Sequence, residues 1–327
     1  MSIKITRPGI STTLQDIGRS GYRNIGIGTA GAMDGFACRI ANYLCGNSDG
    51  DTVIEMNFPA PEILFNNDAL IAITGADFSP RINEENAGVW KTLFVKKGDV
   101  LTFVKPLSGS RAYLAVTGGW AAQQWLGSCS THLKLRTGGH FGRVLQAKDE
   151  LIFLPSKYPL ATRKVFPWSV SRTELDKIYS PANAIRCIAA PEYDQLTDES
   201  KRSLEQQQFT ISRQSDRMGF HLIAEPLSRS DVIELVSSPV DCGTLQLLPG
   251  GNCIVLMADH QTTGGYPRIA SVIKADLPKL AQARPGDPLN FRIVSIGEAE
   301  NKYIQMLESL GQIKKACAHQ LHNFVSA

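Results

Sequence analysis

Short apolar runs that end at turn residues are the feature that most constrains this chain. Residues 70–74, 100–104 and 253–257 are examples, and many of their side chains are β-branched or aromatic. Runs of this length, bounded by Gly, Pro, Asn or Asp, are typical of β-strands. The 28 glycines and 17 prolines supply turns between them. The sequence therefore predicts a mainly β fold.

Helical periodicity is confined to a few segments. Asp34 precedes an apolar stripe at residues 36, 37, 40, 41 and 44, and Gly46 follows it. A capping aspartate, a stripe of period 3.6 and a terminal glycine together predict a helix. Asp276 begins a short helix that must stop before Pro285, and a further short helix is expected near residues 174–179. The stripe within residues 298–316 predicts a C-terminal helix.

The two halves of the chain contain similar motifs in the same order. Gly98-Asp99 recurs as Gly286-Asp287, each before an apolar run, and Asp16-Ile17-Gly18 resembles residues 216–219. Such self-similarity indicates a duplicated β domain. Residues 155–181 are rich in proline and charge, which is typical of a connection between domains. We therefore expect one domain in residues 1–165 and a second in residues 166–327.

Composition excludes several classes of protein. The 34 Lys and Arg residues exceed the 31 Asp and Glu residues by only 3, so the chain lacks the basic face of a nucleic-acid-binding protein. No apolar run is long enough to span a membrane. The seven cysteines form no C-x-x-C pair, and no Cys/His cluster has zinc spacing, so no metal site is expected. Reduced cysteines and a polar N-terminus favour the cytoplasm.

Three polar stretches are candidates for a binding site. Residues 261–267 combine an amide, two hydroxyls, a phenol and two glycines, which suits an amide, a carboxylate or a phosphate oxygen. Residues 12–19 and 214–220 share an Asp, an Arg and a Gly. Each stretch is also consistent with a simple turn or a surface ion pair. If the loops of both domains converge, they would line one pocket.

Other motifs are less informative. Residues 26–31 match G-x-G-x-x-G, but neither a buried parallel strand nor βαβ alternation surrounds them, so a dinucleotide site is not expected. Residues 127–132 favour a turn, and the histidines have no nucleophile at triad spacing. Asp34 is most simply a helix cap, and Asn42 lies off the apolar stripe, facing either a cleft or solvent.

Seven motifs follow one another in order at residues 12–19, 31–34, 41–47, 113–119, 126–128, 215–219 and 259–267. Together these stretches, which span most of the chain, resemble the biotin-dependent carboxyltransferase family. That family includes the C subunit of 5-oxoprolinase, proteins labelled allophanate hydrolase subunit 2, a region of urea carboxylase and an antagonist of a sporulation-kinase inhibitor. His260 departs from the pattern, in which Arg is expected.

The resemblance implies two cyclophilin-like β-barrel domains with a few short helices. It also implies a cyclophilin-like B-type partner subunit, in direct contact with this chain, and an A-type subunit. The complex would use ATP to hydrolyse the lactam of 5-oxoproline to glutamate, and this chain would be inactive alone. A resonance-stabilised lactam reacts slowly with water, so phosphorylation of its carbonyl oxygen would activate it.

The resemblance also suggests roles for particular residues. Asp259, Asp216 and Asp16 are the candidate catalytic residues, either as a base or as groups that orient their neighbours. The remaining candidates would bind the substrate. They are Arg19, Asp34, Asn42, Arg217, Met218, Gln246, Gln261, Thr262, Thr263, Gly264, Gly265 and Tyr266.

Two other functions remain open. One is the transfer of a carboxyl group from carboxybiotin to urea or a related amide, with biotin as cofactor. The chain contains no Met-Lys-Met biotin-attachment motif, which disfavours this alternative. The other is a non-catalytic antagonist of a kinase inhibitor, whose interface between barrels would look the same in sequence.

Overall fold

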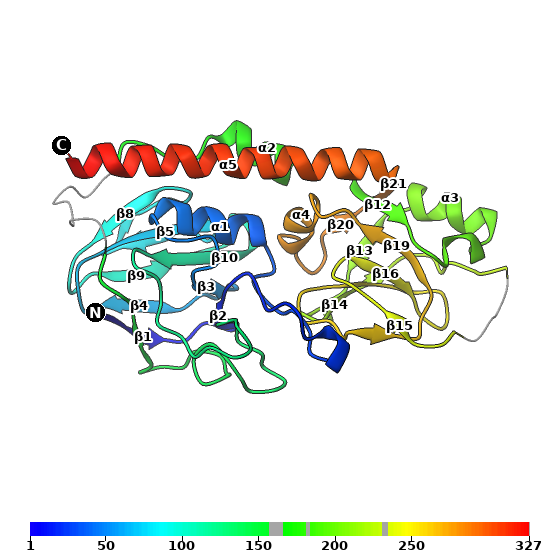
Figure 1. Cartoon of the computed structure of the whole chain (residues 1–327), viewed down its shortest axis with the longest axis horizontal. Coiled ribbons are helices and arrows are strands. Elements are labelled where there is room, and N and C mark those ends of the chain that lie inside the picture. The colour runs from blue at the N-terminus through cyan, green and yellow to red at the C-terminus, as the bar shows by residue number, and fades with distance from the viewer. Residues whose placement is uncertain (157–165, 181–183, 231–234, 327) are drawn as a thin grey trace. The chain divides into compact units, whose positions relative to one another are not determined.

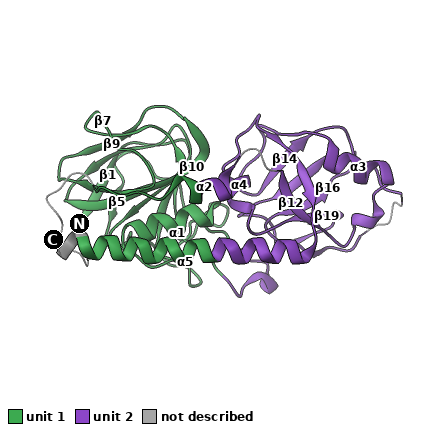
Figure 2. Ribbon diagram, turned by 90° about the horizontal axis from the view of Figure 1, so that it is seen from above, with its two compact units in different colours: residues 1–19, 30–174, 308–327 green, residues 20–29, 175–307 purple. Residues whose placement is uncertain are grey.

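The structure is a computed structural model that describes residues 1–156, 166–180, 184–230 and 235–326. The chain is mainly β with few helices, as predicted, and divides into two compact units (Figures 1 and 2). Unit 1 comprises residues 1–19, 30–174 and 308–327, and unit 2 comprises residues 20–29 and 175–307. The boundary expected at residue 165 falls at the end of residues 157–165, which lie outside the described residues, and it stays a prediction.

Two antiparallel sheets form unit 1. In strand order, the first contains β11 (Glu150–Ile152), β1 (Ser2–Arg7), β4 (Glu62–Phe65), β9 (Val100–Phe103), β6 (Pro80–Ile82) and β7 (Glu85–Asn86). The second contains β2 (Thr12–Gln15), β3 (Val53–Met56), β10 (Ser108–Val116), β5 (Ala69–Asp77) and β8 (Thr92–Val95).

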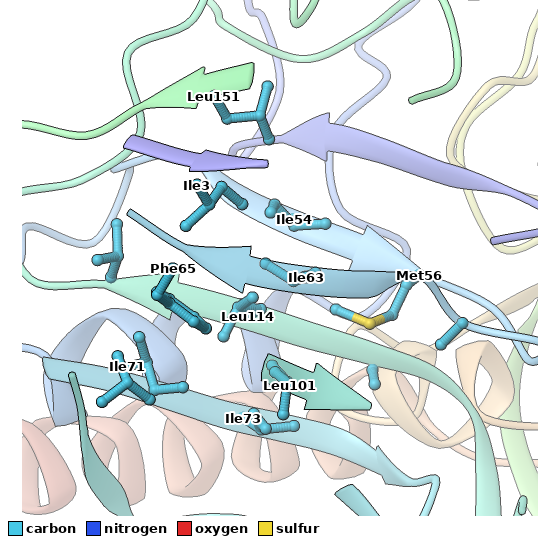
Figure 3. Close-up of a cluster of buried hydrophobic side chains, with 14 of the residues drawn as sticks. Ile3, Ile54, Met56, Ile63, Phe65, Ile71, Ile73, Leu101, Leu114 and Leu151 are labelled. Atoms are coloured by element: carbon cyan, nitrogen blue, oxygen red, sulfur yellow. The ribbon is translucent and has the colours of Figure 1, made fainter. Parts of the chain in front are cut away.

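Alternate side chains of these strands meet in one hydrophobic core. Ile3 of β1, Phe65 of β4 and Leu114 of β10 are fully buried in a cluster that draws on both sheets (Figure 3). Successive side chains of a strand point to opposite faces, so a strand needs apolar residues only at every second position to build such a core. Unit 1 therefore has a core of its own.

Helix α1 (Gly35–Leu44) packs against this unit as the sequence predicts. Asp34 is the N-cap, and its Oδ1 accepts a hydrogen bond from the backbone N–H of Ala37 at 2.9 Å. Its apolar stripe is buried, and Thr74 donates to the Ala37 carbonyl at 2.8 Å. Gly46 follows the helix with a φ of 69°, a left-handed conformation that favours glycine.

Unit 2 contains an eight-stranded sheet that nearly closes into a barrel. In strand order it runs β20 (Pro288–Leu289), β13 (Phe209–Ile211), β14 (Gly219–Ile223), β17 (Cys253–Leu256), β16 (Thr244–Leu247), β19 (Arg268–Val272), β12 (Ile185–Ala189) and β21 (Phe291–Ile293). Asn290 alone separates β20 from β21, so both edges of the sheet belong to one stretch of chain. A separate ladder pairs β15 (Ser238–Pro239) with β18 (Thr263–Gly264).

The other helices are α2 (Arg172–Tyr179), α3 (Asp198–Gln206), α4 (Leu277–Ala281) and α5 (Ile296–Ser326), and η1 (Arg23–Ile25) and η2 (Tyr193–Gln195) are 3₁₀ turns. Helices α2, α4 and α5 were predicted, although α5 extends beyond residue 316 because Cys317 and Leu321 continue its buried face. The sequence did not predict α3, which buries only Ser200 and Leu204. Among the described residues, no helix is both long and apolar enough to cross a membrane.

The repeated motifs form the same turn twice. In unit 1, Asp99 accepts from the Lys96 N–H at 2.8 Å and Gly98 has a φ of 92°. In unit 2, Asp287 accepts from the Arg284 N–H at 2.8 Å and Gly286 has a φ of 91°. Two identical turns, each leading into a strand, support the internal duplication.

The glycines of residues 26–31 allow close packing. A Cβ at Gly28 would lie 3.0 Å from the His260 carbonyl oxygen, and one at Gly31 would lie 2.8 Å from the Gly18 nitrogen. Helix α1 begins only at Gly35, and the 3₁₀ turn η1 precedes the motif in place of a strand. The motif therefore lacks the strand before it and the helix at its last glycine that a dinucleotide-binding loop requires.

Candidate functional site

Asp16 in unit 1 is buried and binds the loop of residues 127–130. Its Oδ1 accepts from the hydroxyls of Ser128 and Ser130, at 2.7 and 2.5 Å, and from the Gly18 N–H at 2.7 Å. Its Oδ2 accepts from the Cys129 N–H at 2.6 Å. Both oxygens are thus engaged, and the carboxylate acts here as an anchor for the loop.

Arg19 contacts the same loop from the other side. It is only 3% exposed, and its Nη2 donates to the Ser130 carbonyl at 2.7 Å. The guanidinium stacks over Trp125, 5.0 Å from the ring centroid, in a cation–π contact. Asp16 and Arg19, both predicted site residues, therefore meet at Ser130.

Asp34 lies in a buried hydrogen-bond network. Its N–H donates to the Tyr113 hydroxyl at 2.8 Å, and that hydroxyl donates to Glu55 Oε2 at 2.9 Å. Glu55 also accepts from the Met33 N–H at 2.8 Å. Burial, assisted by the nearby charges of Glu55 and Asp34, raises the pKa of Tyr113 well above its usual range, so the phenol remains a donor.

Asn42 is also fully buried and holds backbone. Its Nδ2 donates to the Asp51 carbonyl at 2.7 Å, and its Oδ1 accepts from Asn47 Nδ2 at 3.1 Å. Of the two settings left open by the sequence, a cleft or solvent, the structure shows neither. Asn42 fixes the chain that follows helix α1.

In unit 2, residues 216–219 form an exposed turn at the start of β14. Asp216 accepts through Oδ1 from the N–H groups of Met218 and Gly219, at 2.7 and 3.2 Å. An aspartate that bonds the backbone two residues on stabilises such a turn. Met218 is 38% exposed, so both side chains are available to a ligand.

Arg217 and Asp259 form a bidentate ion pair. The guanidinium Nε donates to Asp259 Oδ2 at 2.7 Å and Nη2 donates to Oδ1 at 3.0 Å. Their side chains are 12% and 13% exposed. Because Asp259 neutralises this guanidinium, Arg217 is poorly placed to fork a second carboxylate.

His260 is buried beside this pair. Its ring Nδ1 lies 2.5 Å from the Gln261 carbonyl, and Nε2 lies 3.9 Å from Asp241 Oδ1. Burial lowers the pKa of His260, so the ring is neutral at pH 7. A neutral imidazole cannot replace the guanidinium that the family pattern places here.

The polar loop of residues 261–267 is held by its backbone. The Val240 N–H donates to the Thr262 carbonyl at 3.1 Å, next to the β15–β18 ladder. Gln246 is buried and donates to the Tyr266 carbonyl at 3.3 Å. A Cβ at Gly264 would lie 2.6 Å from Gln246 Nε2, so only glycine fits there without a shift. Exposed Gln261, Thr263, Gly265 and Tyr266 remain open to a ligand.

Arg23 binds the backbone at Val240, which follows strand β15, the partner of β18 in this loop. Its guanidinium donates to the Val240 carbonyl and lies 3.4 Å from Asp241 Oδ1. Arg23 precedes the rest of unit 2 by more than a hundred residues, yet it belongs to that unit. The segment of residues 20–29 is therefore part of the support for the polar loop.

A groove of about 820 Å³ opens on one side of the same loop in unit 2. Gly265, Tyr266 and Pro267 form one wall, and the turn after β16 forms another. This volume lies within the range of small-molecule sites, about 300–1,000 Å³. Within the described chain, no three His, Cys, Asp or Glu side chains gather as metal ligands would. The described residues that line it are Pro226, Leu227, Ser228, Arg229, Leu235, Leu247, Leu248, Pro249, Gly250, Gly251, Gly265, Tyr266 and Pro267.

Comparison with known proteins now adds to this geometry. The carboxyltransferase domain family, subdomain A and B, matches residues 25–293. The chain belongs to this family. Among its relatives, the C subunit of 5-oxoprolinase from Escherichia coli K12 is 38% identical over 91% of this chain and 93% of that protein. The corresponding protein of Haemophilus influenzae is 35% identical over 88% of this chain and 89% of that protein.

The fold of the carboxyltransferase domain is also found in a solved structure. The Kluyveromyces lactis urea amidolyase matches 95% of this chain with a TM-score of 0.86 and 26% identity. This chain spans only 20% of that much longer protein. The family resemblance predicted from the seven motifs is confirmed, as is the mainly β fold class, with a nearly closed barrel sheet in unit 2.

The structure brings together some of the predicted residues of this carboxyltransferase domain. In unit 1, Asp16 and Arg19 both contact the loop of residues 127–130, whereas Asp34 and Asn42 lie near opposite ends of helix α1. In unit 2, Arg217 pairs with Asp259, and Gln246 supports the loop of residues 261–266. That loops of both units line one pocket stays a prediction.

Sequence reasoning missed several residues that shape these sites. Ser128 and Ser130 lie in a stretch correctly interpreted as a turn, but nothing in their spacing shows that both bind Asp16. Glu55 gave no signal because it follows an apolar run inside a strand. Arg229 gave none because no motif surrounds it, and only the groove reveals it.

Proposed function

We propose that this chain is the C subunit of an ATP-dependent 5-oxoprolinase complex that hydrolyses the lactam of 5-oxoproline to glutamate. The single observation that carries this proposal is the 38% identity to the E. coli protein over 93% of that protein's length. Similarity along nearly the whole of both chains leaves little room for a different domain arrangement. The exposed polar loop of unit 2 offers the uncharged donors that an amide substrate requires.

The chemistry explains the need for ATP. A phosphoryl group moves from ATP to the lactam oxygen, and ADP leaves. Water adds to the activated carbon, the carbon–nitrogen bond breaks and the nitrogen takes a proton. A second water releases phosphate, leaving glutamate. The chain's task in this sequence is to hold the ring, to stabilise charge on oxygen and to accept a proton from water.

Asp216 is the candidate carboxylate best suited to act as the base. Asp16 and Asp259 use both of their oxygens for hydrogen bonds. Asp216 is exposed and uses only Oδ1, so its Oδ2 has no partner among the described residues. We therefore assign the proton-accepting role to Asp216 and positioning roles to the other two.

The loop of residues 261–266 would hold the lactam. Gln261 and Thr263 are exposed, and Gly264 and Gly265 let the backbone approach a ligand closely. The buried Thr262 would stabilise the loop. Uncharged donors suit an oxygen that gains negative charge only in the transition state.

ATP would be bound by another subunit. The glycine motif of residues 26–31 is used for packing, and the chain has no G-x-x-x-x-G-K sequence. We expect a B-type subunit in direct contact and an A-type subunit to complete the site, so the isolated chain would be inactive.

A second candidate is carboxyl transfer to urea or another amide. The urea amidolyase of Saccharomyces cerevisiae is 30% identical over 89% of this chain, although the chain covers only 16% of that protein. In this case carboxybiotin, presented by another protein, would replace phosphate as the activating partner. The same loop would then hold the acceptor amide.

Reconstitution separates the two functions. The chain, purified with A-type and B-type subunits, is expected to release glutamate from 5-oxoproline only with ATP and only with all three proteins present. Bicarbonate-dependent and biotin-dependent carboxylation of urea, without glutamate release, would establish the alternative. If neither reaction occurs and the chain binds a kinase inhibitor tightly, both enzymatic functions are contradicted.

Two matched variants test the role of Asp216. Asp216→Asn keeps an oxygen for the turn but removes the base, and we expect kcat to fall about 100-fold. Asp194→Asn alters a 94% exposed carboxylate of the same unit and should leave kcat unchanged. Equal activity of the two variants would exclude Asp216 as the base.

A further inference from the structure

The described residues that line the groove of unit 2 are mainly apolar and include one charged side chain. Leu227 and Leu247 are 3% and 5% exposed and form part of its floor, and Pro226, Pro249 and Pro267 add rigid apolar walls. Tyr266, 47% exposed, offers an aromatic face. Of the described residues that line the groove, only Arg229 carries a charge.

Arg229 differs from three other half-buried arginines of unit 2. Arg186, Arg217 and Arg268 each form a bidentate pair with a carboxylate, and their side chains are 12–21% exposed. Arg229 instead donates from Nη1 to the neutral amide oxygen of Gln195 at 3.2 Å. Within the described residues, no carboxylate forms an ion pair with it.

A cation in an apolar groove without a paired carboxylate favours an anionic ligand. Partial burial removes water from the guanidinium, so a carboxylate that replaces that water gains more than it would on an open surface. The planar guanidinium matches the two oxygens of a carboxylate. The neutral amide of Gln195 restrains the orientation of the guanidinium without compensating its charge.

We propose that this groove binds a small organic carboxylate through Arg229, while its leucine, proline and tyrosine walls cover the apolar part of the ligand. The identity of this ligand rests on the proposed function: the carboxylate is that of 5-oxoproline. Arg217, a substrate-binding candidate from the sequence, is less suited to this role because Asp259 neutralises it. The loop of residues 265–267, which lines the groove, connects this anion site to the donors for the lactam.

Ligand pairs test the assignment on the full-length chain. Ligand-observed NMR would compare 5-oxoproline with 2-pyrrolidinone, the same ring without the carboxylate. We expect the carboxylate to strengthen binding about tenfold, as a charge-assisted hydrogen bond does. Arg229→Gln should abolish that preference, Arg229→Lys should keep part of it, and the surface variant Arg202→Gln should keep all of it. A wild-type preference in Arg229→Gln would overturn the proposal.

The complex supplies a second, kinetic readout. Arg229→Gln should raise the KM for 5-oxoproline about tenfold and leave kcat within about threefold, because binding of the carboxylate changes little during the reaction. A loss of kcat at unchanged KM would contradict a carboxylate-binding role. Circular dichroism and the Lys variant distinguish these results from misfolding.

Failure of the proposed function would look different. Cyclopentanecarboxylate has the carboxylate but no lactam, and its binding should also depend on Arg229. If the wild-type complex does not turn over 5-oxoproline while the chain still binds cyclopentanecarboxylate through Arg229, the anion site stands and the oxoprolinase assignment fails. Equal binding of this probe by wild type and Arg229→Gln would remove the anion site itself.

Discussion

The polar candidates of the two units occupy opposite environments. In unit 1, Asp16, Asp34 and Asn42 are buried and hold backbone or hydroxyl groups. In unit 2, Asp216 and the loop of residues 261–266 carry mostly exposed side chains. Asp16 and Asp216 belong to similar sequence motifs, and each accepts from the N–H two residues later, yet only Asp16 binds a second loop.

This difference shows how duplicated motifs diverge. The short Asp–Gly turn folds locally wherever it occurs, so its sequence is retained in both units. Whether the remaining carboxylate oxygen anchors a neighbour or faces a ligand depends on the loops that surround it. Asp16 therefore anchors a loop of unit 1, whereas Asp216 leaves one carboxylate oxygen exposed, as its proposed role requires.

The largest expected effect tests that contrast directly. Asp16→Ala removes an acceptor of four hydrogen bonds and leaves buried donors unsatisfied, so we expect the free energy of unfolding to fall by about 3–5 kcal/mol. Asp216→Ala should cost about 1 kcal/mol or less because its donors can bond to water. Urea unfolding monitored by fluorescence would measure both. Equal losses would break the comparison.

Lowering the pH should reveal how much the ion pair between Arg143 and Asp149 stabilises unit 1. Arg143 hydrogen-bonds Asp149 at 2.7 and 2.8 Å and lowers the pKa of Asp149 to about 2. Because the folded-state pKa is lowered, the stabilisation, about 2 kcal/mol, is complete above the ordinary pKa of 3.8 and is lost as pH falls through 2. Asp149→Asn should lose this pH dependence between pH 4 and 2. A variant with the wild-type acid profile would contradict the assignment.

A smaller effect should distinguish the support of the loop in unit 2. Arg23→Ala removes the donor to the Val240 carbonyl, so amide exchange at Val240 and Gly264 should accelerate about fivefold, equivalent to about 1 kcal/mol. Asp241→Asn, which keeps that donor, serves as the matched control. Acceleration in the strands of unit 1, or none near Val240, would show that Arg23 does not hold the loop.

The smallest effect should come from an exposed ion pair of unit 1. Lys314 lies 2.5 Å from Asp49 and 5.3 Å from the centroid of the Tyr43 ring, and its side chain is 53% exposed. Lys314→Ala should lower the free energy of unfolding by only about 0.5 kcal/mol. A loss as large as that of Asp16→Ala would mean that surface charge, and not burial, stabilises unit 1.

The sequence predicted the parts of the fold that depend on local patterns. The apolar runs, the Asp34 cap and the Gly98 and Gly286 turns are local signals, and each appears in the structure. Contacts between distant residues gave no such signal. Ser130 lies 114 residues from Asp16, and Arg23 lies 217 residues from Val240, so neither pairing could be read from spacing. The motifs located the polar loop of unit 2, but only coordinates showed that Arg217 pairs with Asp259 and that Arg229 has no ion pair among the described residues.

Helix α5 has a consequence for how the chain is made. Its first residues belong to unit 2, and residues 308–327 belong to unit 1, where Leu310, Ile313 and Cys317 are buried. Residues 1–19 and 30–174 of unit 1 lack this apolar cover until residues 308–327 have been synthesised, after the whole of unit 2. Unit 1 contains the strands that are made first, yet it completes its fold only after unit 2 has been made.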